Sequence, residues 1–349
     1  VKLVVGVEED GTTEKLDITY AIGADTKAVT LKLTTADYAG EPVYIKTALD
    51  DVLVTEDENQ TPALTKDTPT LEYTLPEDGD VTLYYGTQED FVSAWYGDGT
   101  ATDYYIRTAE ELAYLSALTN GTAKDCHGDS VDPDAFENKF VSLIRDIDLS
   151  AYPDWIPIGY GYYDFEGTLD GENHTVTVNM DKRFSDESES DITVGIIGWL
   201  NGIVKNLSVA GSITVVNETS NTAYVGAIVG TFGNSAATIS QCKNAATIDV
   251  DVTVSNANVG GIVGASRQKK YNSNVQEVVN CLNEGNITIH AAADLTVNAA
   301  GIMGEGKGGN PISSCWNTGD VSVTVAESAN VTSIKGNVAG IVGYNSNIT

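Results

Sequence analysis

A four-residue motif, Gly-Ile-x-Gly, recurs along the C-terminal part of the chain and limits its fold more than any other feature. It occurs at 195–198, 261–264, 301–304 and 340–343, and a variant beginning with alanine lies at 227–230. The last glycines of successive motifs are 32, 34, 40 and 39 residues apart. A period of this length is typical of a solenoid, a propeller or another array of stacked units. The sequence therefore predicts a repeat domain over residues 139–349.

A second block follows each motif in a fixed frame. It reads ISQCKNAATI at 239–248, VVNCLNEGNI at 278–287 and ISSCWNTGDV at 312–321, while VKNLSVAGSI at 204–213 has leucine in the cysteine position. This position always precedes the next aligned Ile or Val by 6 residues, whereas it follows the motif glycine by 9, 12, 17 or 11 residues. One turn is therefore rigid and one connection is variable, and the variable edge is where binding would arise.

The second block predicts two columns of stacked side chains, because equivalent positions of in-register parallel strands lie about 4.8 Å apart. One column would hold leucine and three cysteines: Leu207, Cys242, Cys281 and Cys315. A position shared by leucine and cysteine is expected to point inward, where free cysteine behaves as a small apolar side chain. Disulfides between neighbours would need a particular side-chain geometry. A metal site is not expected in this column, since no histidine joins it.

The other column would hold three asparagines at the turn: Asn244, Asn283 and Asn317. Stacked asparagine side chains hydrogen-bond along the stack and satisfy the backbone groups of the turn. We therefore interpret both columns as structural.

The first 87 residues have a different pattern. Five segments alternate apolar and polar residues between turn-forming clusters, at 16–22, 28–33, 43–49, 71–75 and 81–85. This spacing predicts a small antiparallel β-sandwich of immunoglobulin-like size over residues 1–87. Residues 88–138 are expected to form a junction that carries the clearest helix of the chain.

That helix is predicted over residues 108–120. Thr108 and Glu111 form a capping box, and Asn120-Gly121 supplies a stop signal. Three leucines make one apolar stripe: Leu112, Leu115 and Leu118. Because an uncovered terminal strand is a template for aggregation, we expect the helix to cover the first coil of the repeat domain.

The charge of the chain limits its partners. The formal net charge is −31, which argues against nucleic acid or an anionic membrane as the main partner, since both are bound by clustered Lys and Arg. It is typical of a soluble protein in a salty medium. No apolar stretch is long enough to cross a membrane. A start at Val1 without a signal peptide is expected of a mature or trimmed chain.

The repeats, together with one further block, resemble a known family. The Gly-Ile-x-Gly motifs with their CxNxG blocks are similar to the GLUG-motif repeats of bacterial surface proteins. The block FVSLIRDIDLS at 140–150, followed by WIPIG and FEGTLDGENHTVTV up to residue 178, looks like the first coils of surface-anchored β-helix proteins of Gram-positive gut bacteria. The resemblance covers about residues 105–349. It implies an all-β fold, a right-handed parallel β-helix, in a longer cell-wall-attached chain. The chain stops within a repeat, as expected of a fragment.

Residues with catalytic or metal-binding chemistry are scattered. None of the three histidines, His127, His174 and His290, is expected to be catalytic, and His290 should face solvent because it alternates with inward isoleucines. The acidic turn with Asp146 and Asp148 could hold structural Ca²⁺, although no EF-hand or nonapeptide calcium pattern is present. No cofactor and no catalytic metal is predicted. No peptidase signature such as HExxH occurs.

Aromatic residues form one candidate ligand site. The glycine-punctuated segment IGYGYYDF at 158–165 carries Tyr160, Tyr162 and Tyr163. Aromatic faces stack on sugars, and exposed aromatic patches mark binding sites. The competing interpretation is packing between domains, and it is the one that we adopt for Trp95 and Tyr104.

Basic residues form a second candidate site. The segment ASRQKKY at 265–271 concentrates Arg267, Lys269 and Lys270 in the longest variable connection, and Lys307 lies in the equivalent connection of the next repeat. These four cations would bind an anionic partner such as an acidic glycan, or else balance nearby carboxylates.

The sequence as a whole predicts a non-catalytic protein of the bacterial cell surface: a rigid β-solenoid stalk or adhesin segment that presents a binding surface to a host protein or glycan. The alternative is a carbohydrate-active β-helix enzyme, or a glycan-binding module, with its site on the variable edge. A groove lined by acids and aromatics across adjacent coils would favour the alternative, and a flat polar ladder would favour the stalk.

Overall fold

The computed structural model describes seven strands within residues 2–86 and the segments 95–97, 99–125, 129–187, 192–266, 274–292, 295–307, 311–325 and 335–345. The chain divides into two compact units, which are residues 1–100 with 124–129, and residues 101–123 with 130–349.

The described strands of the first unit form two sheets. The four-stranded sheet has the order β1 (Lys2–Val5), β7 (Thr82–Gly86), β4 (Val43–Lys46), β5 (Ala63–Leu64), and the three-stranded sheet has the order β2 (Ile18–Ile22), β3 (Ala28–Leu33), β6 (Thr70–Thr74). β1 and β7 are parallel, and the other pairs are antiparallel. The five alternating segments all become strands, while β1 and β5 have no such pattern.

The second unit is a parallel β-solenoid built from four sheets. The seven-stranded sheet has the order β29 (Ile312–Ser313), β24 (Gln276–Val279), β19 (Ala237–Ser240), β15 (Ile203–Lys205), β11 (Thr168–Asp170), β9 (Phe140–Leu143), β8 (Asp103–Ile106). The nine-stranded sheet contains β10 (Ile147–Asp148), β12 (Thr175–Phe184), β16 (Ser208–Asn217), β20 (Lys243–Asn244), β21 (Thr247–Val252), β25 (Leu282–Asn283), β26 (Ile287–Ala291), β30 (Trp316–Asn317) and β31 (Val321–Val325).

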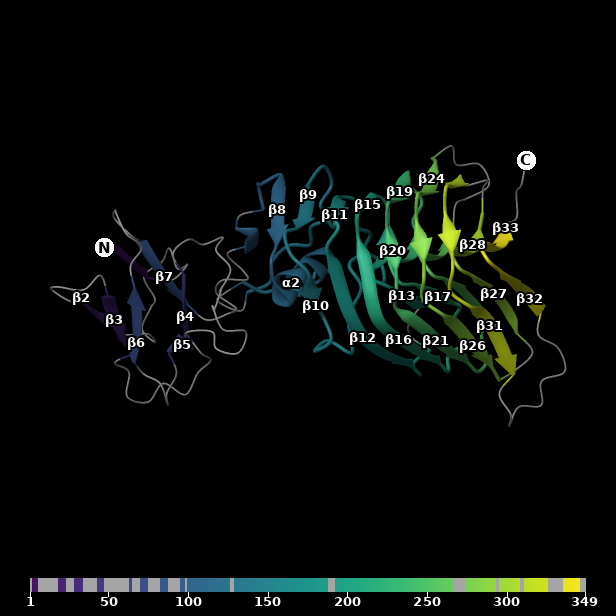
Figure 1. Ribbon diagram of the computed structural model, residues 1–349, viewed down its shortest axis with the longest axis horizontal. Coiled ribbons are helices and arrows are strands. Elements are labelled where there is room, and N and C mark those ends of the chain that lie inside the picture. Colours follow the sequence, from purple (N-terminus) through teal and green to yellow (C-terminus); the bar gives the residue numbers. More distant parts are fainter. Residues whose placement is uncertain are drawn as a thin grey trace. The chain divides into compact units, whose positions relative to one another are not determined.

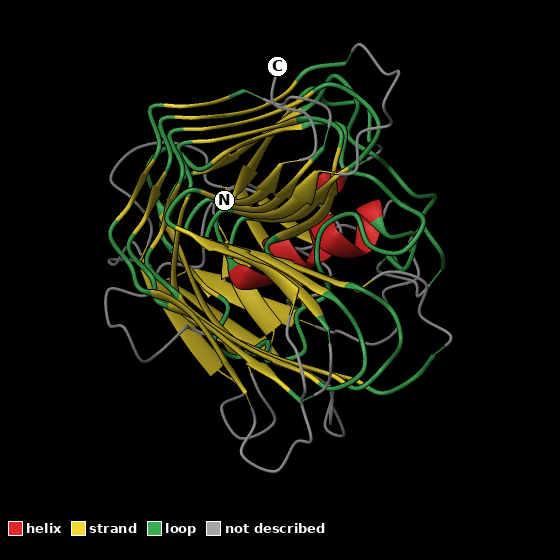
Figure 2. Ribbon diagram, turned by 90° about the vertical axis from the view of Figure 1, so that its right-hand side faces the viewer, coloured by secondary structure: helices red, strands yellow, loops and turns green. Residues whose placement is uncertain are grey.

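Two five-stranded sheets complete each coil. One has the order β13 (Ile192–Val194), β17 (Ala223–Gly226), β22 (Ala257–Gly260), β27 (Thr296–Ala300), β32 (Lys335–Ala339). The other has the order β14 (Ile197–Leu200), β18 (Val229–Phe232), β23 (Val263–Ser266), β28 (Met303–Gly306), β33 (Val342–Asn345). Figure 1 shows these strands side by side along the stack, and Figure 2 shows the coils end-on around a common interior. The predicted all-β parallel β-helix is confirmed.

Strand register places equivalent repeat positions one above another. Ile213, Ile248, Ile287 and Val321 are successive partners in β16, β21, β26 and β31. Along β21, exposed and buried residues alternate strictly, so one face of the sheet is the core and the other meets solvent. The interior is therefore a set of aliphatic columns, which explains why the repeat tolerates little variation at these positions.

The Gly-Ile-x-Gly motif forms the sharp corner between the two five-stranded sheets. Its isoleucine points into the core, as Ile262 does with no exposed surface. A Cβ added to Gly261 would lie 2.3 Å from the Asn283 side-chain oxygen, and one added to Gly301 would lie 2.1 Å from the Asn317 side chain. Glycine is required where two parts of the chain approach this closely. The glycine motif and the asparagine column thus pack together as one unit.

Helix α2 spans Ala109–Thr119, as predicted. The Thr108 side chain accepts a hydrogen bond from the Glu111 backbone N–H at 3.2 Å, and Glu111 in turn accepts one from the Arg107 N–H. The three leucines of its stripe are at most 1% exposed. Figure 1 places α2 beside β8 and β10, and Figure 2 shows it lying across the interior outlined by the coils, so the helix covers the N-terminal end of the stack.

The solenoid begins earlier than the predicted boundary at residue 139. β8 lies in the seven-stranded sheet and pairs in parallel with β9. Tyr104 and Ile106 of β8 point inward, and the Tyr104 ring meets Phe136 edge-on with centroids 5.5 Å apart. The turn residues around this strand concealed its alternating pattern. Tyr104 is thus a packing residue, but it packs within the solenoid core and not between the two domains as expected.

Candidate functional site

The cysteine column points into the solenoid, as predicted. Cys242 and Cys281 are at most 1% exposed, Cys315 is half-buried, and all three thiols are free. The backbone N–H of Leu282 donates to the Cys242 carbonyl, which keeps the column in register. The contact with the Cys242 thiol, together with burial, raises the pKa of Cys281 to about 12. Because the thiolate is the reactive form, this cysteine is inert near neutral pH.

Cys281→Ala is therefore expected to lower the free energy of unfolding by about 1 kcal/mol, through lost apolar contact, and to leave ligand binding unchanged. In the native protein, iodoacetamide should spare Cys242 and Cys281, with peptide mapping to read each cysteine separately. Rapid labelling of Cys281 before unfolding, or a loss of binding at unchanged melting temperature, would contradict a purely structural column.

The asparagine column is a chain of buried hydrogen bonds. Asn244 Nδ2 donates to Asn283 Oδ1 at 2.7 Å, and Asn283 Nδ2 donates to Asn317 Oδ1 at 2.7 Å. Each amide also donates to the carbonyl two residues later, as Asn283 does to Gly285 O at 2.8 Å. Both N–H groups of the Asn244 and Asn283 amides are used inside the fold, so these two side chains hold the turns.

The candidate ligand residues of the sequence analysis do not converge in the described structure. Tyr162 is 94% exposed and Tyr163 is 39% exposed, while the Tyr160 backbone N–H donates to Asn120 Oδ1. Lys307 is paired with Glu305 at 3.3 Å. The basic residues Arg267, Lys269 and Lys270 lie outside the described residues, and so does His127.

A groove crosses four adjacent coils at the strands of the seven-stranded sheet. It encloses about 360 Å³, and residues 138–140, 166–168, 201–203 and 236–238 line it. In the third and fourth of these coils, the lining residues belong to the variable connection, which is only 9 and 12 residues long there against 17 in the next repeat. The groove therefore lies on the variable edge, where the connections are short.

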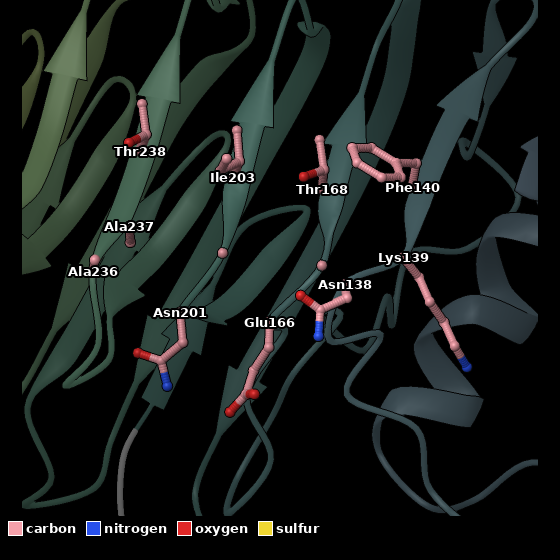
Figure 3. A pocket seen from close by; sticks show the side chains of 12 residues that line it. Asn138, Lys139, Phe140, Glu166, Thr168, Asn201, Ile203, Ala236, Ala237 and Thr238 are labelled. Atoms are coloured by element: carbon pink, nitrogen blue, oxygen red, sulfur yellow. The ribbon is translucent and has the colours of Figure 1, made fainter. Parts of the chain in front are cut away.

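One row of outward side chains forms the floor of the groove. Strand register aligns Phe140, Thr168, Ile203 and Thr238 as successive partners in β9, β11, β15 and β19. Figure 3 shows these four side chains in a line across the strands. Phe140 is 52% exposed and Ile203 is 40% exposed. These two apolar side chains lie on the solvent face of the sheet and are not part of the core.

Acidic residues frame this row. Its register continues to Asp103 on β8 and to Glu277 on β24, so that a carboxylate stands at each end. Glu166 lines the groove within one coil of Phe140 and Ile203 (Figure 3), and partial burial, with the charges of Glu137 and Asp164, raises its pKa above the ordinary value. A carboxyl group in such a site can accept hydrogen bonds from hydroxyls or hold a proton.

Polar neighbours hold the groove in place. Asn201 Nδ2 donates to Asp164 Oδ2 at 2.8 Å, and Asn201 Oδ1 accepts from the Ser235 N–H at 2.9 Å. Burial raises the pKa of Asp164. A Cβ on Gly202 would lie 2.1 Å from the Gly167 carbonyl oxygen, so adjacent coils approach too closely here for any other residue. These contacts fix the positions of the side chains that border the groove.

In the acidic turn that was considered for Ca²⁺, both aspartates accept hydrogen bonds from groups of the protein. Asp146 accepts a hydrogen bond from the Thr175 N–H at 2.8 Å and lies 3.3 Å from His174 Nδ1. The Thr175 bond is the main cause that lowers the pKa of Asp146. Asp148 accepts from the Ser150 N–H, and hydrogen bonds from Ser150 lower its pKa too.

The groove residues were not predicted from the sequence. Their signal is weak but present: each occupies the outward position directly before a buried residue of its strand, and these buried residues are Val141, Leu169, Val204 and Ile239. Hydroxyl, aliphatic and aromatic side chains alternate in this position, so no residue type repeats. Only register brings them into one row.

Comparisons with known proteins give partial matches. No family model matches the chain. It is 30% identical over 188 residues, 50% of the chain, to halomucin of Haloquadratum walsbyi, and 30% identical over 141 residues, 38% of the chain, to a protein of Evansella cellulosilytica described as a Gly-rich membrane protein. The matches span only 2% and 14% of the lengths of these relatives.

One solved structure is similar over most of the chain. It is a Bacteroides ovatus protein assigned as an immunoglobulin A1 protease, with a TM-score of 0.47 and 19% sequence identity over 70% of this chain and 74% of that one. Among the described residues, no helix combines the length and apolar character needed to cross a membrane.

Proposed function

We propose that this chain is a segment of an extracellular bacterial surface protein whose solenoid binds an extended glycan along the outer face of its seven-stranded sheet. The binding site is the groove described above. The observation that carries the proposal is the row of Phe140, Thr168, Ile203 and Thr238, which takes one outward side chain from each of four adjacent coils.

The spacing of this row suits a linear chain of sugars. Adjacent parallel strands lie about 4.8 Å apart, which is comparable with the length of one sugar residue. Apolar and aromatic side chains stack on the faces of sugar rings, while hydroxyl and carboxylate groups bind ring hydroxyls. A glycan running along the stack would thus meet one contact per coil.

The charge of the site narrows the glycan class. Glu166 and Lys139 line the groove, and the charge of Lys139 is balanced by Asp134. Asp103 and Glu277 stand at the ends of the row, and the whole chain carries a formal charge of −31. Such a field repels polyanions. We therefore propose a neutral or amino-bearing glycan as the ligand, in place of the acidic glycan that the basic segment alone would favour.

The cell-surface location is part of the same proposal. The names of the two partial relatives, a halomucin and a Gly-rich membrane protein, support it. A solenoid contributes length and stiffness, which suit presentation away from a cell. The assignment to GLUG-type repeat proteins of Gram-positive bacteria, in a longer wall-attached chain, rests on the Gly-Ile-x-Gly and CxNxG motifs.

The test is a glycan array with the whole chain, followed by calorimetry on neutral oligosaccharides of increasing length. Affinity should rise with each added sugar until the four positions of the row are filled. Phe140→Ala should weaken binding about tenfold, equivalent to about 1.4 kcal/mol. Tyr162→Ala removes an aromatic side chain that is 94% exposed outside the groove and should change nothing. Binding that Tyr162→Ala abolishes and Phe140→Ala spares would refute the proposed site.

A second candidate function, glycan cleavage, is favoured by the position of Glu166 in the groove, where partial burial raises its pKa. A carboxyl that keeps its proton nearer neutral pH can act as a general acid toward a glycosidic oxygen. Release of reducing ends from the bound oligosaccharide would identify the enzyme, and Glu166→Gln should then remove that release while keeping binding. If intact oligosaccharide is recovered from the wild-type protein, the site is a binding site only.

A further inference from the structure

A second cluster lies on the outer face of the nine-stranded sheet, away from the glycan groove. Side-chain ligand atoms of Asp249, Asp251 and His290 all lie within 4.8 Å of one another. Strand register creates the cluster: Asp249 and Asp251 are alternate outward residues of β21, and His290 of β26 is the direct partner of Asp251. His290 is 39 or more positions from the two aspartates in the sequence, and strand pairing brings it beside them.

The His290 imidazole is held in orientation by a contact at Nδ1. Thr324 Oγ1 on β31 lies 2.7 Å from His290 Nδ1, and the same hydroxyl donates to the Ile289 carbonyl at 3.4 Å. In the tautomer that carries the proton on Nδ1, this N–H donates to the Thr324 hydroxyl, and Nε2 keeps the lone pair that a metal ion requires. A hydrogen bond of this kind, from the far nitrogen of a ligating histidine, fixes the ring in metal sites.

The Nε2 atom of His290 faces a carboxylate. His290 Nε2 lies 3.1 Å from Asp249 Oδ1. Two electron-pair donors at this distance need a proton or a metal ion between them. Neighbouring ligands around tetrahedral zinc are about 3.3 Å apart, given metal–ligand bonds of about 2.0–2.1 Å. The pair is therefore already spaced as two zinc ligands are.

Asp251, the third ligand, and the neighbouring residues on strand β16 also favour a cation. Asp251 is exposed, so its carboxylate can turn toward the same point without disturbing the core. On the flanking strand β16 the positions beside the two aspartates are Thr214 and Val216, and neither carries a charge that competes for the carboxylates. One imidazole with two carboxylates is a ligand set for Zn²⁺ and similar divalent transition metals, since imidazole is a poor ligand for Mg²⁺ and Ca²⁺.

We propose that Asp249, Asp251 and His290 bind one divalent transition-metal ion, with Zn²⁺ as the probe ion, on the outer face of the solenoid. Three protein ligands leave at least one coordination position open to water or to a donor from another molecule. The site is independent of the glycan groove, which is formed by the seven-stranded sheet.

The experiment is calorimetric titration of the EDTA-treated whole chain with ZnCl₂ in excess Mg²⁺, so that diffuse binding to an acidic surface is suppressed. The wild-type protein should bind one ion at this site, and its melting temperature should rise with zinc. His290→Gln and Asp251→Asn should each weaken this binding by more than about 100-fold, because loss of even an outer-shell partner costs about 10- to 100-fold. Thr324→Val, which removes only the orienting hydroxyl, should weaken it about tenfold.

His174 supplies the matched control. It also lies beside an aspartate of the neighbouring coil, with Nδ1 3.3 Å from Asp146 Oδ1. His174→Gln should leave zinc binding unchanged. Wild-type protein that does not bind zinc, His290→Gln protein that binds as well as wild type, or equal losses in the His174 and His290 variants would each overturn the proposal.

Discussion

Asn283→Ala is expected to lower the free energy of unfolding by about 3 kcal/mol, a large effect for the loss of one polar side chain. The side chain is fully buried and makes three hydrogen bonds, accepting from Asn244 and donating to Asn317 and to the Gly285 carbonyl. Its removal leaves buried groups of two neighbouring coils without their partner. It also opens a space against Gly261, which packs on the same side chain.

The measurement is urea unfolding followed by circular dichroism, with Asn179→Ala as the control. Asn179 lies on the exposed face of β12 and accepts a single hydrogen bond from Ser212. The control should change the free energy of unfolding by no more than about 0.5 kcal/mol. If the two variants lose the same stability, the asparagine column is not the element that fixes the turns.

Leu115→Glu is expected to detach the helix from the end of the solenoid and to cause self-association. Leu115 has no exposed surface in the structure, and a carboxylate there would be buried without a cationic partner. The expected destabilisation of the cap is about 4 kcal/mol or more. Once the helix leaves, β8 and β9 present an uncovered apolar coil, and such ends pair with other chains.

Light scattering coupled to gel filtration checks this prediction, and Ala109→Glu is the control. Ala109 is the first residue of α2 and is half-exposed, and an acidic residue in the first turn is favourable to a helix. The control should remain as monodisperse as the wild-type protein. A Leu115→Glu protein that stays monodisperse and melts at the wild-type temperature would show that the helix is not a cap.

The fold was predictable from the sequence because the repeats can be aligned with one another without any other information. Once Cys242, Cys281 and Cys315 share a frame with Leu207, stacking follows, and stacking implies an inward column and a neighbouring asparagine column. The helix was predictable for a different reason: the Thr108–Glu111 capping box and the leucine stripe are local signals that need no knowledge of the rest of the fold.

A second asparagine column is present that was not predicted from the sequence. Asn337 Nδ2 donates to Asn298 Oδ1 at 3.0 Å, and Asn298 Nδ2 donates to Asn258 Oδ1 at 2.9 Å. These three asparagines each precede a motif glycine by three residues, so alignment on the motif would have revealed them. Their signal was hidden because the first repeats have other residues in this position.

The functional clusters were harder to predict, for a physical reason. Phe140 and Thr238 are nearly a hundred residues apart, and so no local pattern joins them; they meet because β9, β11, β15 and β19 are in register. His290 was correctly expected to face solvent, yet its partners Asp249 and Asp251 lie one coil earlier. Register between coils depends on the lengths of the connections, which vary from repeat to repeat.

The central claim, that a glycan lies along the groove, is tested most directly by a crystal structure of the chain with the neutral oligosaccharide that binds best. We expect sugar rings stacked on Phe140 and Ile203, hydroxyls bonded to Glu166, and successive residues stepping from coil to coil. A sugar bound instead at Tyr162, or at the basic segment 265–271, with the groove holding only water, would contradict the account.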